Sequence, residues 1–408
     1  METLFSLDDP DKIYLHIGAP DHSLLPTDLL LSSELFKQES DLLNSLQYGA
    51  TQGSSSVRLE LSKFLTREYK DVVDPDKLLI TGGASQSFFN MIPLFTDSNT
   101  VFLMENPTYF LAWQMLKDHG ITDSRIVGIS SDENGLDTRE LLNFLNQVAH
   151  VPHVPNVENE VDHKVKDPIV TLTDSKDSRK KFKYLLYLVP TFSNPTGVTT
   201  SLERRLKLIE IAKEYDILVV CDDVYHLLYF ENQMPPPRLV SLSSSNVISN
   251  CSFSKIFSPG FRLGWIETCP ALLDQFNRSG LLNSGGCSNQ LTSFLVKSIL
   301  SKSENHLKNL RAEYENRKSL LIKELAKLPS HYQISEPRGG FFIWIVDTSK
   351  KVNTLELLKK MQKTSFTPGN LFSFGKTHGH CLRISFGHYH GDALVKGAKD
   401  LVEILKLH

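Results

Sequence analysis

Long apolar runs are absent from this sequence of 408 residues. No stretch approaches the roughly 18–20 consecutive apolar residues that a membrane-spanning helix needs. The opening residues, Met-Glu-Thr-Leu-Phe-Ser-Leu-Asp-Asp, also lack the basic region of a secretory signal and the arginine- and serine-rich bias of a transit peptide. These absences argue against a membrane protein and predict a cytoplasmic one.

Cysteine is scarce and net charge is small. The five cysteines are scattered and none are spaced as C-x-x-C, which argues against a disulfide framework or a zinc ribbon and fits a reducing compartment. The net charge of -3 provides no field that would favour nucleic acid or an anionic membrane. We therefore expect neither partner, and the hydrophobic content of 40% is that of an ordinary globular protein.

Two kinds of pattern alternate through the middle of the chain. Short apolar runs alternate with segments of helical periodicity, the clearest of which runs from Leu202 to Ala212 after Thr200-Ser201-Leu202-Glu203, a T-x-x-E capping box. Continuous apolar strands separated by helices indicate a mainly parallel sheet covered on both faces. The predicted strands are Lys77–Thr81, Thr100–Glu105, Tyr184–Val189, Ile217–Asp222, Val247–Ser252 and Leu263–Glu267.

The chain is too long for one ordinary core, so we expect a large α/β domain with a smaller α+β companion. A long amphipathic stretch, Lys302–Leu328, separates the two, and strand-like runs at 339–346 and 381–386 follow with helical sequence at 354–363 and 392–406. The predicted division is an N-terminal arm at 1–46 that joins the small domain, a large domain at 47–298 and a small domain at 299–408. Residues 150–183, rich in proline and mixed charge, are predicted to be an insertion or flexible loop.

Lys255 lies in Ser-Phe-Ser-Lys-Ile-Phe-Ser-Pro-Gly-Phe-Arg-Leu-Gly-Trp (252–265). A lysine becomes a covalent catalyst when its amine is neutral enough to attack a carbonyl. Ser252, Ser254 and Arg262 would place hydroxyls and a fixed cation beside that amine. Such a set could hold the phosphate of pyridoxal 5′-phosphate (PLP) next to a Schiff-base lysine, although a surface Ser/Lys loop would look similar when read alone.

Asp222 ends a predicted strand and is followed by Asp223-Val224-Tyr225. A carboxylate at the carboxyl end of a parallel strand faces the crevice where α/β proteins bind ligands, and it would stay ionised beside a pyridinium. The alternative is a turn or a helix cap. Only one of the two aspartates suits the ring, and the three-residue spacing to Tyr225 selects Asp222.

Three further segments carry polar side chains at similar places. Asn194, in an Asn-Pro turn after a strand, can donate to a phenolic oxygen together with Tyr225, or can serve the turn alone. Thr81-Gly82-Gly83-Ala84-Ser85-Gln86 opens a helical pattern whose first N–H groups form an anion site. Arg383, inside a strand-like run, suits a planar carboxylate of the substrate, or else a structural salt bridge.

Four histidines, His378, His380, His388 and His390, flank Arg383 as two H-x-H pairs. The pairs suggest a metal, but no third ligand has a sensible spacing, so we expect no metal site.

Taken together, these segments resemble a fold-type I PLP-dependent aminotransferase, of the branch that contains 2-aminoadipate, kynurenine and aromatic amino-acid aminotransferases. The resemblance runs from about Gly18 to Arg383. Its motifs are Gly-Ala-Pro-Asp (18–21), Leu-Gln-Tyr-Gly-Ala-Thr-Gln-Gly (46–53), Thr-Gly-Gly-Ala-Ser-Gln (81–86), Glu-Asn-Pro-Thr-Tyr-Phe (105–110), Asn-Pro-Thr-Gly (194–197), Asp-Asp-Val-Tyr (222–225), Ser-Phe-Ser-Lys (252–255), Pro-Gly-Phe-Arg-Leu-Gly (259–264) and Arg-Gly-Gly-Phe-Phe-Ile-Trp (338–344).

The resemblance implies a role for each matching residue. Lys255 would carry the Schiff base and then move the substrate proton, while Asp222 would keep the ring nitrogen protonated. Tyr109 would stack on the ring, and Tyr225 with Asn194 would bond its phenolic oxygen. The phosphate would be bound by Gly83, Ala84, Ser85, Ser252, Ser254 and Arg262, with Tyr48 reaching the phosphate of the neighbouring subunit in a homodimer. Arg383, Asn194 and the Gly18 backbone would hold the substrate carboxylate.

The sequence departs from the family pattern in the arm and before the aspartates. No arginine precedes Arg58, so a basic group of the arm that meets a distal carboxylate must be a lysine or a histidine, or be absent, which favours apolar or aromatic amino acids over 2-aminoadipate. Cys221 stands where the family usually has an acidic residue.

The expected activity is exchange of an amino group between an L-amino acid and a 2-oxo acid. A PLP-dependent lyase or decarboxylase is the alternative on the same fold, although Arg383 argues against decarboxylation, which needs the carboxylate out of the ring plane. A non-catalytic PLP-binding transcription regulator is a remote alternative. Such regulators carry a DNA-binding domain of several tens of residues ahead of the coenzyme domain, whereas the first motif here begins by Gly18.

Overall fold

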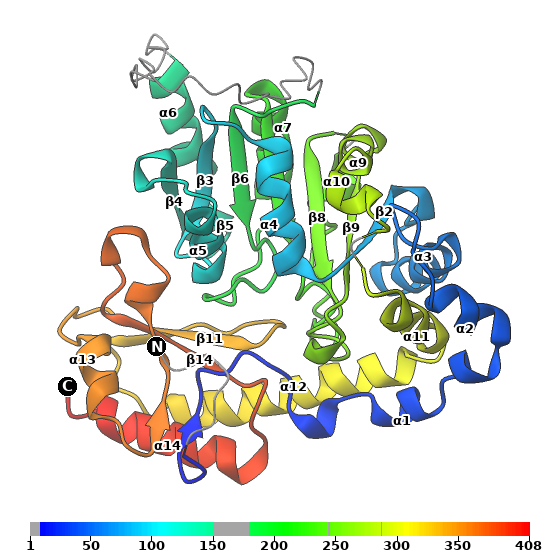
Figure 1. Cartoon of the computed structure of the whole chain (residues 1–408). Coiled ribbons are helices and arrows are strands. Elements are labelled where there is room, and N and C mark those ends of the chain that lie inside the picture. Colours follow the sequence, from blue (N-terminus) through cyan, green and yellow to red (C-terminus); the bar gives the residue numbers. More distant parts are fainter. Residues whose placement is uncertain (1–8, 150–178, 244, 287) are drawn as a thin grey trace, which may run out of the picture.

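The structure is a computed structural model that describes residues 9–149, 179–243, 245–286 and 288–408 (Figure 1). Within these ranges, eight strands form one large sheet in the order β2-β9-β8-β7-β6-β3-β4-β5. Strands β8, β7, β6, β3 and β4 run parallel, whereas β9 and β5 are antiparallel to their neighbours. The strands are β2 (Leu78–Thr81), β3 (Val101–Asn106), β4 (Ile126–Asp132), β5 (Gly135–Leu136), β6 (Tyr184–Leu188), β7 (Ile217–Asp222), β8 (Val247–Ser252) and β9 (Gly264–Thr268).

The mainly parallel sheet predicted from the sequence is confirmed, and its central strands are fully buried. Every residue of β6, β7 and β8 is buried, because helices cover both faces. Side chains of α4 and α5 pack in the cluster on the face that carries Tyr187, and those of α6 and α7 in the cluster on the face of Tyr184. The helices of this part are α3 (Ser55–Tyr69), α4 (Ala84–Phe95), α5 (Phe110–Asp118), α6 (Thr138–Ala149), α7 (Leu202–Glu214), α8 (Leu239–Leu242), α9 (Pro270–Asn277), α10 (Gly280–Asn283) and α11 (Gln290–Leu300).

Strand β4 was not among the predicted strands. Its sequence, Ile-Val-Gly-Ile-Ser-Ser-Asp, is mostly half-buried because it lies beside the short edge strand β5. It therefore lacks the continuous apolar run by which the central strands are recognised.

The predicted capping box before α7 is wrong by one residue. Ser201, not Thr200, is the N-cap, and its hydroxyl accepts the Arg204 N–H at 3.3 Å. Thr200 is buried instead, and its carbonyl accepts the Arg205 Nε–H at 2.9 Å. Glu203 therefore lies one position too early for the reciprocal contact of a capping box.

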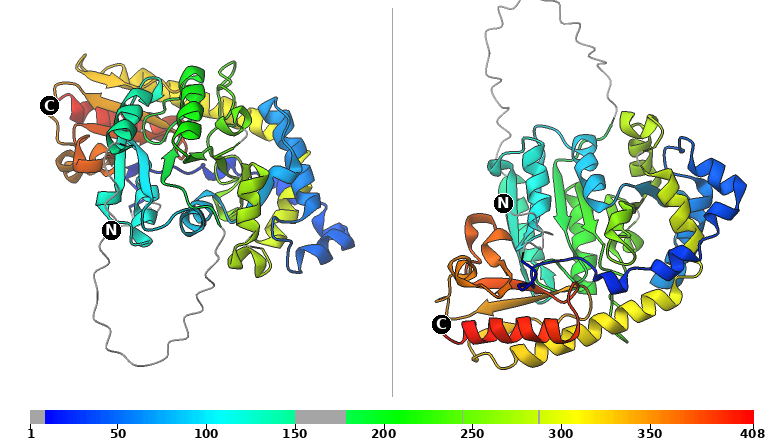
Figure 2. Two further views of the ribbon diagram at one scale, coloured as in Figure 1. Left: turned by 90° about the horizontal axis from the view of Figure 1, so that it is seen from above. Right: turned by 60° about the horizontal axis from the view of Figure 1, so that its bottom comes forward.

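The C-terminal part is a second layer built on an antiparallel sheet, in the order β10-β11-β14-β13. Two helices, α12 and α14, pack side by side beneath this sheet (Figures 1 and 2). The elements are α12 (Glu304–Leu325), β10 (Tyr332–Ile334), β11 (Phe342–Asp347), α13 (Thr354–Lys360), β13 (Thr367–Pro368), β14 (Cys381–Ser385) and α14 (Gly391–Leu405). The predicted segments match α12, β11, α13, β14 and α14 to within a few residues, whereas the short strands β10 and β13 were not predicted.

The N-terminal segment links the two parts. Strand β1 (Ile13–Tyr14) pairs in parallel with β12 (Thr364–Ser365) in the C-terminal part. Further on, α1 (Thr27–Leu31) and α2 (Glu39–Ser45) pack against α11, where Asp41 forms an ion pair with Lys297 at 2.8 Å. Short 3₁₀ helices occupy His22–Leu24, Leu35–Lys37, Pro75–Lys77, Asp123–Arg125, Pro259–Phe261, Gly369–Leu371 and Phe374–Lys376.

Most of the predicted loop at 150–183 lies outside the described residues, which resume at 179. The last residues of that range are part of the core. Phe182 is buried, donates its backbone N–H to Phe95 O at 2.9 Å and packs its ring against Phe95.

Two features are absent from the described residues. No helix there combines the length and the apolar character needed to cross a bilayer. No group of three or more histidine, cysteine or acidic side chains in the same residues is arranged to hold a metal ion.

Candidate active site

The carboxyl ends of the central parallel strands face β11 and β14 of the second sheet (Figure 1). Asp222 is the last residue of β7, and its carboxylate is almost fully buried. Its Oδ2 accepts a hydrogen bond from the Tyr187 hydroxyl at 2.6 Å, while Oδ1 has no partner among the described residues. Burial raises the pKa of Asp222 to about 6, against the opposing effects of Tyr187 and Lys255.

Lys255 follows the neighbouring strand β8 and points toward the N-terminal segment. Its Nζ donates to Gly18 O at 2.6 Å and lies 5.5 Å from the centroid of the Phe341 ring. Burial lowers the pKa of Lys255 from 10.5 to about 8, and the nearby cations Arg383 and Arg262 act in the same direction. Asp222 opposes this shift, so the aspartate and the lysine sense each other's charge.

A small polar cradle lies at the start of α4. Gly83 has a φ of +100° at the N-cap, and a Cβ there would stand 3.7 Å from Arg262 Nη2 and 3.8 Å from Ser252 Oγ. Ser252 Oγ donates to Ser254 Oγ at 2.9 Å. Ala84 and the exposed Ser85 follow in the first helical turn, whose N–H groups favour an anion. The structure thus brings the six residues predicted to bind phosphate to one place.

Two buried tyrosines lie close enough to Asp222 to sense its charge. Tyr109 precedes α5 and Tyr225 follows β7, and the pKa of each phenol is raised, first by burial and then by the Asp222 charge. Tyr225 also packs edge-on against Phe342, with ring centroids 5.7 Å apart. Both phenols therefore remain protonated and can donate hydrogen bonds.

Arg383 comes from β14 and reaches the same space. Its Nη1 donates to Asn194 Oδ1 at 2.8 Å, and its Nη2 donates to His16 O at 2.7 Å and to Thr367 Oγ1 at 3.0 Å. The guanidinium carbon lies 4.2 Å from the centroid of the Phe342 ring, and Nε has no partner among the described residues. Burial lowers the pKa of Arg383 to about 10, so the guanidinium is still a cation at neutral pH.

The structure places Gly18 in the cluster and Tyr48 outside it. A Cβ on Gly18 would come within 2.9 Å of the Phe342 ring, so the backbone can approach only because the side chain is absent. Tyr48 is 88% exposed and instead lies over Gly285, where a Cβ would come within 2.4 Å of its ring.

Several residues of the cluster were not predicted. Tyr187 and Thr367 bond to Asp222 and Arg383, while Phe342 and Phe372 flank the guanidinium. A tyrosine in an otherwise apolar strand is the one signal that could have drawn attention to Tyr187. The others come from distant segments and carry no local pattern.

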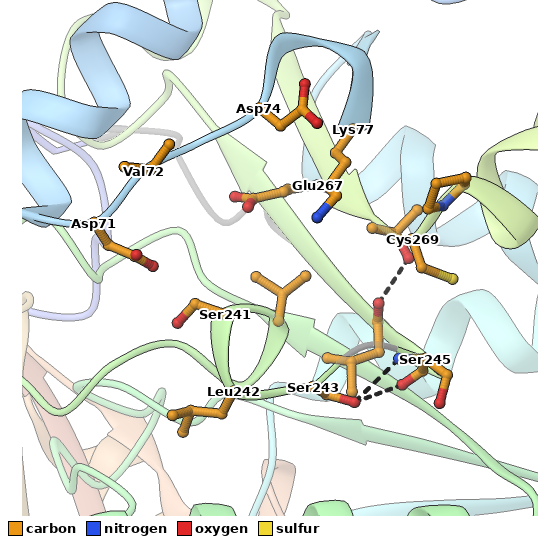
Figure 3. A pocket seen from close by; sticks show the side chains of 14 residues that line it. Asp71, Val72, Asp74, Lys77, Ser241, Leu242, Ser243, Ser245, Glu267 and Cys269 are labelled. Atoms are coloured by element: carbon orange, nitrogen blue, oxygen red, sulfur yellow. Dashed lines mark hydrogen bonds between the residues drawn. The ribbon is translucent and has the colours of Figure 1, made fainter.

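A separate hollow of about 490 Å³ lies away from this cluster, between β9 and the segment after α8. Asp71, Asp74, Lys77 and Glu267 line it, and Figure 3 shows them opposite Ser241, Ser243 and Ser245. Glu267 is held by the buried Arg238. None of the residues predicted to bind coenzyme or substrate lines this hollow.

The cluster fits PLP by the chemistry of its unsatisfied groups. The free and buried Oδ1 of Asp222 needs a donor, which a protonated pyridine nitrogen would provide. The cradle at Gly83 offers hydroxyls, a cation and helix N–H groups to a phosphate. The poorly solvated Lys255 amine is suited to a covalent link with an aldehyde.

The comparisons with known proteins agree. An uncharacterized protein of Saccharomyces cerevisiae is 29% identical, with 96% of each chain covered. An aromatic-amino-acid aminotransferase of Thermococcus litoralis is 25% identical over 99% of this chain and 90% of its own. A kynurenine aminotransferase structure from Pyrococcus horikoshii, in complex with PMP, has a TM-score of 0.81 at 25% identity and covers 97% of this chain and 91% of that one. The family described as aminotransferase class I and II matches residues 10–394. The chain therefore belongs to this family of PLP-dependent aminotransferases.

Proposed function

We propose that this transaminase exchanges the amino group of an apolar or aromatic L-amino acid with a 2-oxo acid, with Lys255 and Asp222 as its catalytic residues. The observation that carries the proposal is the meeting of four groups in one buried space. These are an amine of lowered pKa, a carboxylate with one free oxygen, an anion cradle and a guanidinium from the second sheet.

Bound PLP supplies a cationic conjugated ring that withdraws electrons from the substrate Cα. Lys255 attaches the coenzyme through Nζ, and a pKa of about 8 leaves about a tenth of the amines neutral at pH 7. Once the substrate amine has taken its place, the same nitrogen would be free to remove the proton from the substrate Cα and deliver it to the carbon of the coenzyme to which the substrate nitrogen is joined. The pKa of Lys255, lowered by burial, thus favours both attachment of the coenzyme and removal of the substrate proton.

Asp222 holds the proton on the ring nitrogen through its free Oδ1, because a carboxylate next to a cation favours the charged state of both. Tyr225 and Asn194 donate to the phenolic oxygen, and Tyr109 covers one ring face. The phosphate is held by Gly83, Ala84, Ser85, Ser252, Ser254 and Arg262. The proximity of these residues to Asp222 and Gly83 supports the assignments.

Arg383 binds the substrate carboxylate with Asn194 and the Gly18 backbone. The guanidinium is fixed by three hydrogen bonds, so its remaining N–H donors have defined directions. A carboxylate held in this way is not free to leave as carbon dioxide, and the Cα proton is the group that Lys255 can remove. This supports transamination over decarboxylation.

The surroundings of Arg383 favour an uncharged substrate side chain. Phe342 and Phe372 lie on the guanidinium, and His16 of the arm accepts a hydrogen bond from it through its backbone carbonyl. Burial lowers the pKa of His16 to about 4, with Arg383 adding to the effect, so the imidazole is neutral at pH 7. A second carboxylate on the substrate, as in 2-aminoadipate, would find no cation in this histidine.

We include a homodimer in the proposal because exposed apolar side chains gather on the N-terminal helices and the helices beside them. The packed helices α1, α2 and α11 carry large apolar side chains that face solvent in one chain. A second copy covers this surface and brings its Tyr48 to the phosphate cradle. The exposed side chains are Leu31, Phe36, Leu43, Leu46, Tyr48, Leu281 and Leu291.

The proposal also includes the division of the chain into domains and its cellular location. The arm at 1–46, the large domain at 47–298 and the small domain at 299–408 are the units we propose from the positions of the two sheets. A cytoplasmic location is supported by the cysteines, since Cys221, Cys251, Cys269 and Cys381 are all free.

A single-turnover panel tests the proposed substrate class. The coenzyme-loaded protein is mixed with leucine, phenylalanine, tyrosine, aspartate, glutamate or 2-aminoadipate without an acceptor, and the coenzyme absorbance is followed. We expect at least one apolar or aromatic amino acid to react about tenfold faster than 2-aminoadipate, and Lys255→Ala to give no turnover. Product analysis must find the 2-oxo acid. Fastest reaction with 2-aminoadipate would refute the substrate class, and no reaction with any amino acid would refute the activity.

A further inference from the structure

Tyr187 is a buried side chain that the proposed reaction does not yet use. It lies on β6, where it pairs in register with Val220 of β7, two residues before Asp222. Its hydroxyl donates to Asp222 Oδ2 at 2.6 Å, and its ring packs on Phe88 of α4 with centroids 4.8 Å apart. A tyrosine fixed by strand pairing and by ring packing has little freedom to turn its hydroxyl elsewhere.

The hydrogen bond has one direction. Burial, and then the charge of Asp222, raises the pKa of Tyr187 well above 10, so the phenol keeps its proton and donates it. A donated hydrogen bond favours the charged carboxylate and lowers the pKa of Asp222, which opposes the larger effect of burial. Tyr187 thus helps the buried aspartate to remain an anion.

The two oxygens of Asp222 have different surroundings. Oδ2 is bonded to Tyr187, whereas Oδ1 is buried without a partner among the described residues. Rotation of the carboxylate would break the bond to Tyr187, so Tyr187 determines which oxygen stays available and where it points. We propose that Tyr187 is a positioning residue that holds Asp222 so that its free oxygen meets the coenzyme ring nitrogen, an inference that rests on the role proposed above for Asp222.

The other groups around Asp222 do not replace this contact. Lys255 and Asp223 act on the pKa of the carboxylate through their charges, and the backbone of Val224 lowers that pKa slightly. Tyr109 and Tyr225 sense the charge of Asp222, but no hydrogen bond from either to its carboxylate is found. Among the described residues, Tyr187 is the one side chain that donates a hydrogen bond to Asp222.

Tyr187→Phe removes the hydroxyl and keeps the ring that packs on Phe88. The matched control is Tyr184→Phe, because Tyr184 is a buried tyrosine of the same strand whose side chain lies in the apolar cluster on the opposite face of the sheet. Both variants remove one phenolic oxygen from β6. Only the first removes a bond to Asp222, so a general loss of packing would affect both variants alike.

The first measurement uses the cofactor-free protein. The carboxyl carbons of aspartate are labelled with ¹³C, and the Asp222 signal is identified by its loss in Asp222→Asn. We expect Tyr187→Phe to raise the pKa of Asp222 by roughly one unit and Tyr184→Phe to leave it unchanged. An unchanged pKa in Tyr187→Phe would overturn the proposal, whether or not the protein proves to be a transaminase.

The second measurement uses the holoenzyme with coenzyme labelled with ¹⁵N in the ring. Asp222→Asn gives the reference signal of a ring that is not held protonated. We expect the ring nitrogen signal of Tyr187→Phe to move toward this reference, with kcat about tenfold lower and KM within about threefold of the unsubstituted enzyme. A ring signal that stays at the unsubstituted position would refute the positioning role, even if activity fell. Failure of the unsubstituted protein to bind coenzyme would refute the proposed function, and the cofactor-free titration would then decide on Tyr187 alone.

Discussion

Asn194 and Arg383 are joined by a hydrogen bond of 2.8 Å although 189 positions separate them in the chain. Asn194 lies in the turn after β6 of the large sheet, and Arg383 lies on β14 of the small one. The bond therefore ties the two sheets together at the point where we place the substrate carboxylate.

Replacement of Arg383 by lysine tests this placement. Lysine keeps the positive charge but lacks the planar fork of donors that bonds to Asn194, His16 and Thr367 together. We expect kcat/KM for amino acids to fall about 100-fold, mainly through a higher KM, while coenzyme binding is retained. Arg204→Lys, a change of the same type at an ion pair with Asp132, should leave the kinetics unchanged. Normal kinetics in Arg383→Lys would contradict the carboxylate site.

The pH dependence of coenzyme attachment tests the lowered pKa of Lys255. Only the neutral amine attacks the aldehyde, so covalent uptake by the cofactor-free protein should rise with pH and level off above about 8. An ordinary lysine would instead continue to rise toward 10.5. Because the charge of Asp222 raises the pKa of Lys255, Asp222→Asn should move the midpoint to lower pH. Mass spectrometry after hydride reduction measures the extent of attachment, and Lys255→Ala shows the background.

Asp222 should make the cofactor-free protein less stable at neutral pH. The pKa of Asp222 is raised in the folded state from 3.8 to about 6, so between these values the folded chain holds a proton that the unfolded chain has released. Stability from this residue is therefore present at low pH and is lost as the pH rises toward 6. We expect cofactor-free Asp222→Asn to be about 1–3 kcal/mol more stable than the unsubstituted protein at about pH 7.5, with a smaller difference at about pH 5.

Urea unfolding of the two proteins at these two pH values checks this expectation. Saturation with coenzyme should reverse the order at the higher pH, because the Asp222 carboxylate then has a cationic partner, whereas the neutral amide of the variant does not attract that cation. Equal stability of the cofactor-free proteins at both pH values would contradict the raised pKa.

A charge on the apolar surface of α1 tests the homodimer. Leu31 is 86% exposed in one chain, and Leu31→Asp would bury a carboxylate between two copies. We expect sedimentation velocity to show monomers, and activity at submicromolar protein to fall at least about tenfold, because Tyr48 of the partner subunit is lost. Leu407→Asp is the matched control, since Leu407 is 81% exposed at the other end of the chain. A fully active dimer in Leu31→Asp would place the interface elsewhere.

The sequence was informative where the chemistry is local. Asp222 ends one apolar strand, Lys255 comes shortly after the end of a second, and the glycines at 82–83 follow a third. Their place at one edge of a parallel sheet could therefore be predicted. The contact of Arg383 with Asn194 could not, because it depends on how β14 of the second sheet is placed. The tyrosine at position 187 is a weak sequence signal that does not identify Asp222 as its partner, since a buried tyrosine is common in strands. The capping residue of α7 was misplaced because Thr200 and Ser201 are equally suitable caps by type.

Helix α12 links the position of the layer that carries Arg383 to the packing at the distant start of the helix. Its 22 residues extend about 33 Å, from the last helix of the large domain to the layer that carries Arg383. A tilt of about two degrees at the Ser303 end would therefore displace the other end by about 1 Å, which is the scale at which catalytic alignment is lost. Substitutions that tilt this helix should therefore alter turnover by displacing Arg383, although they lie far from any reacting atom.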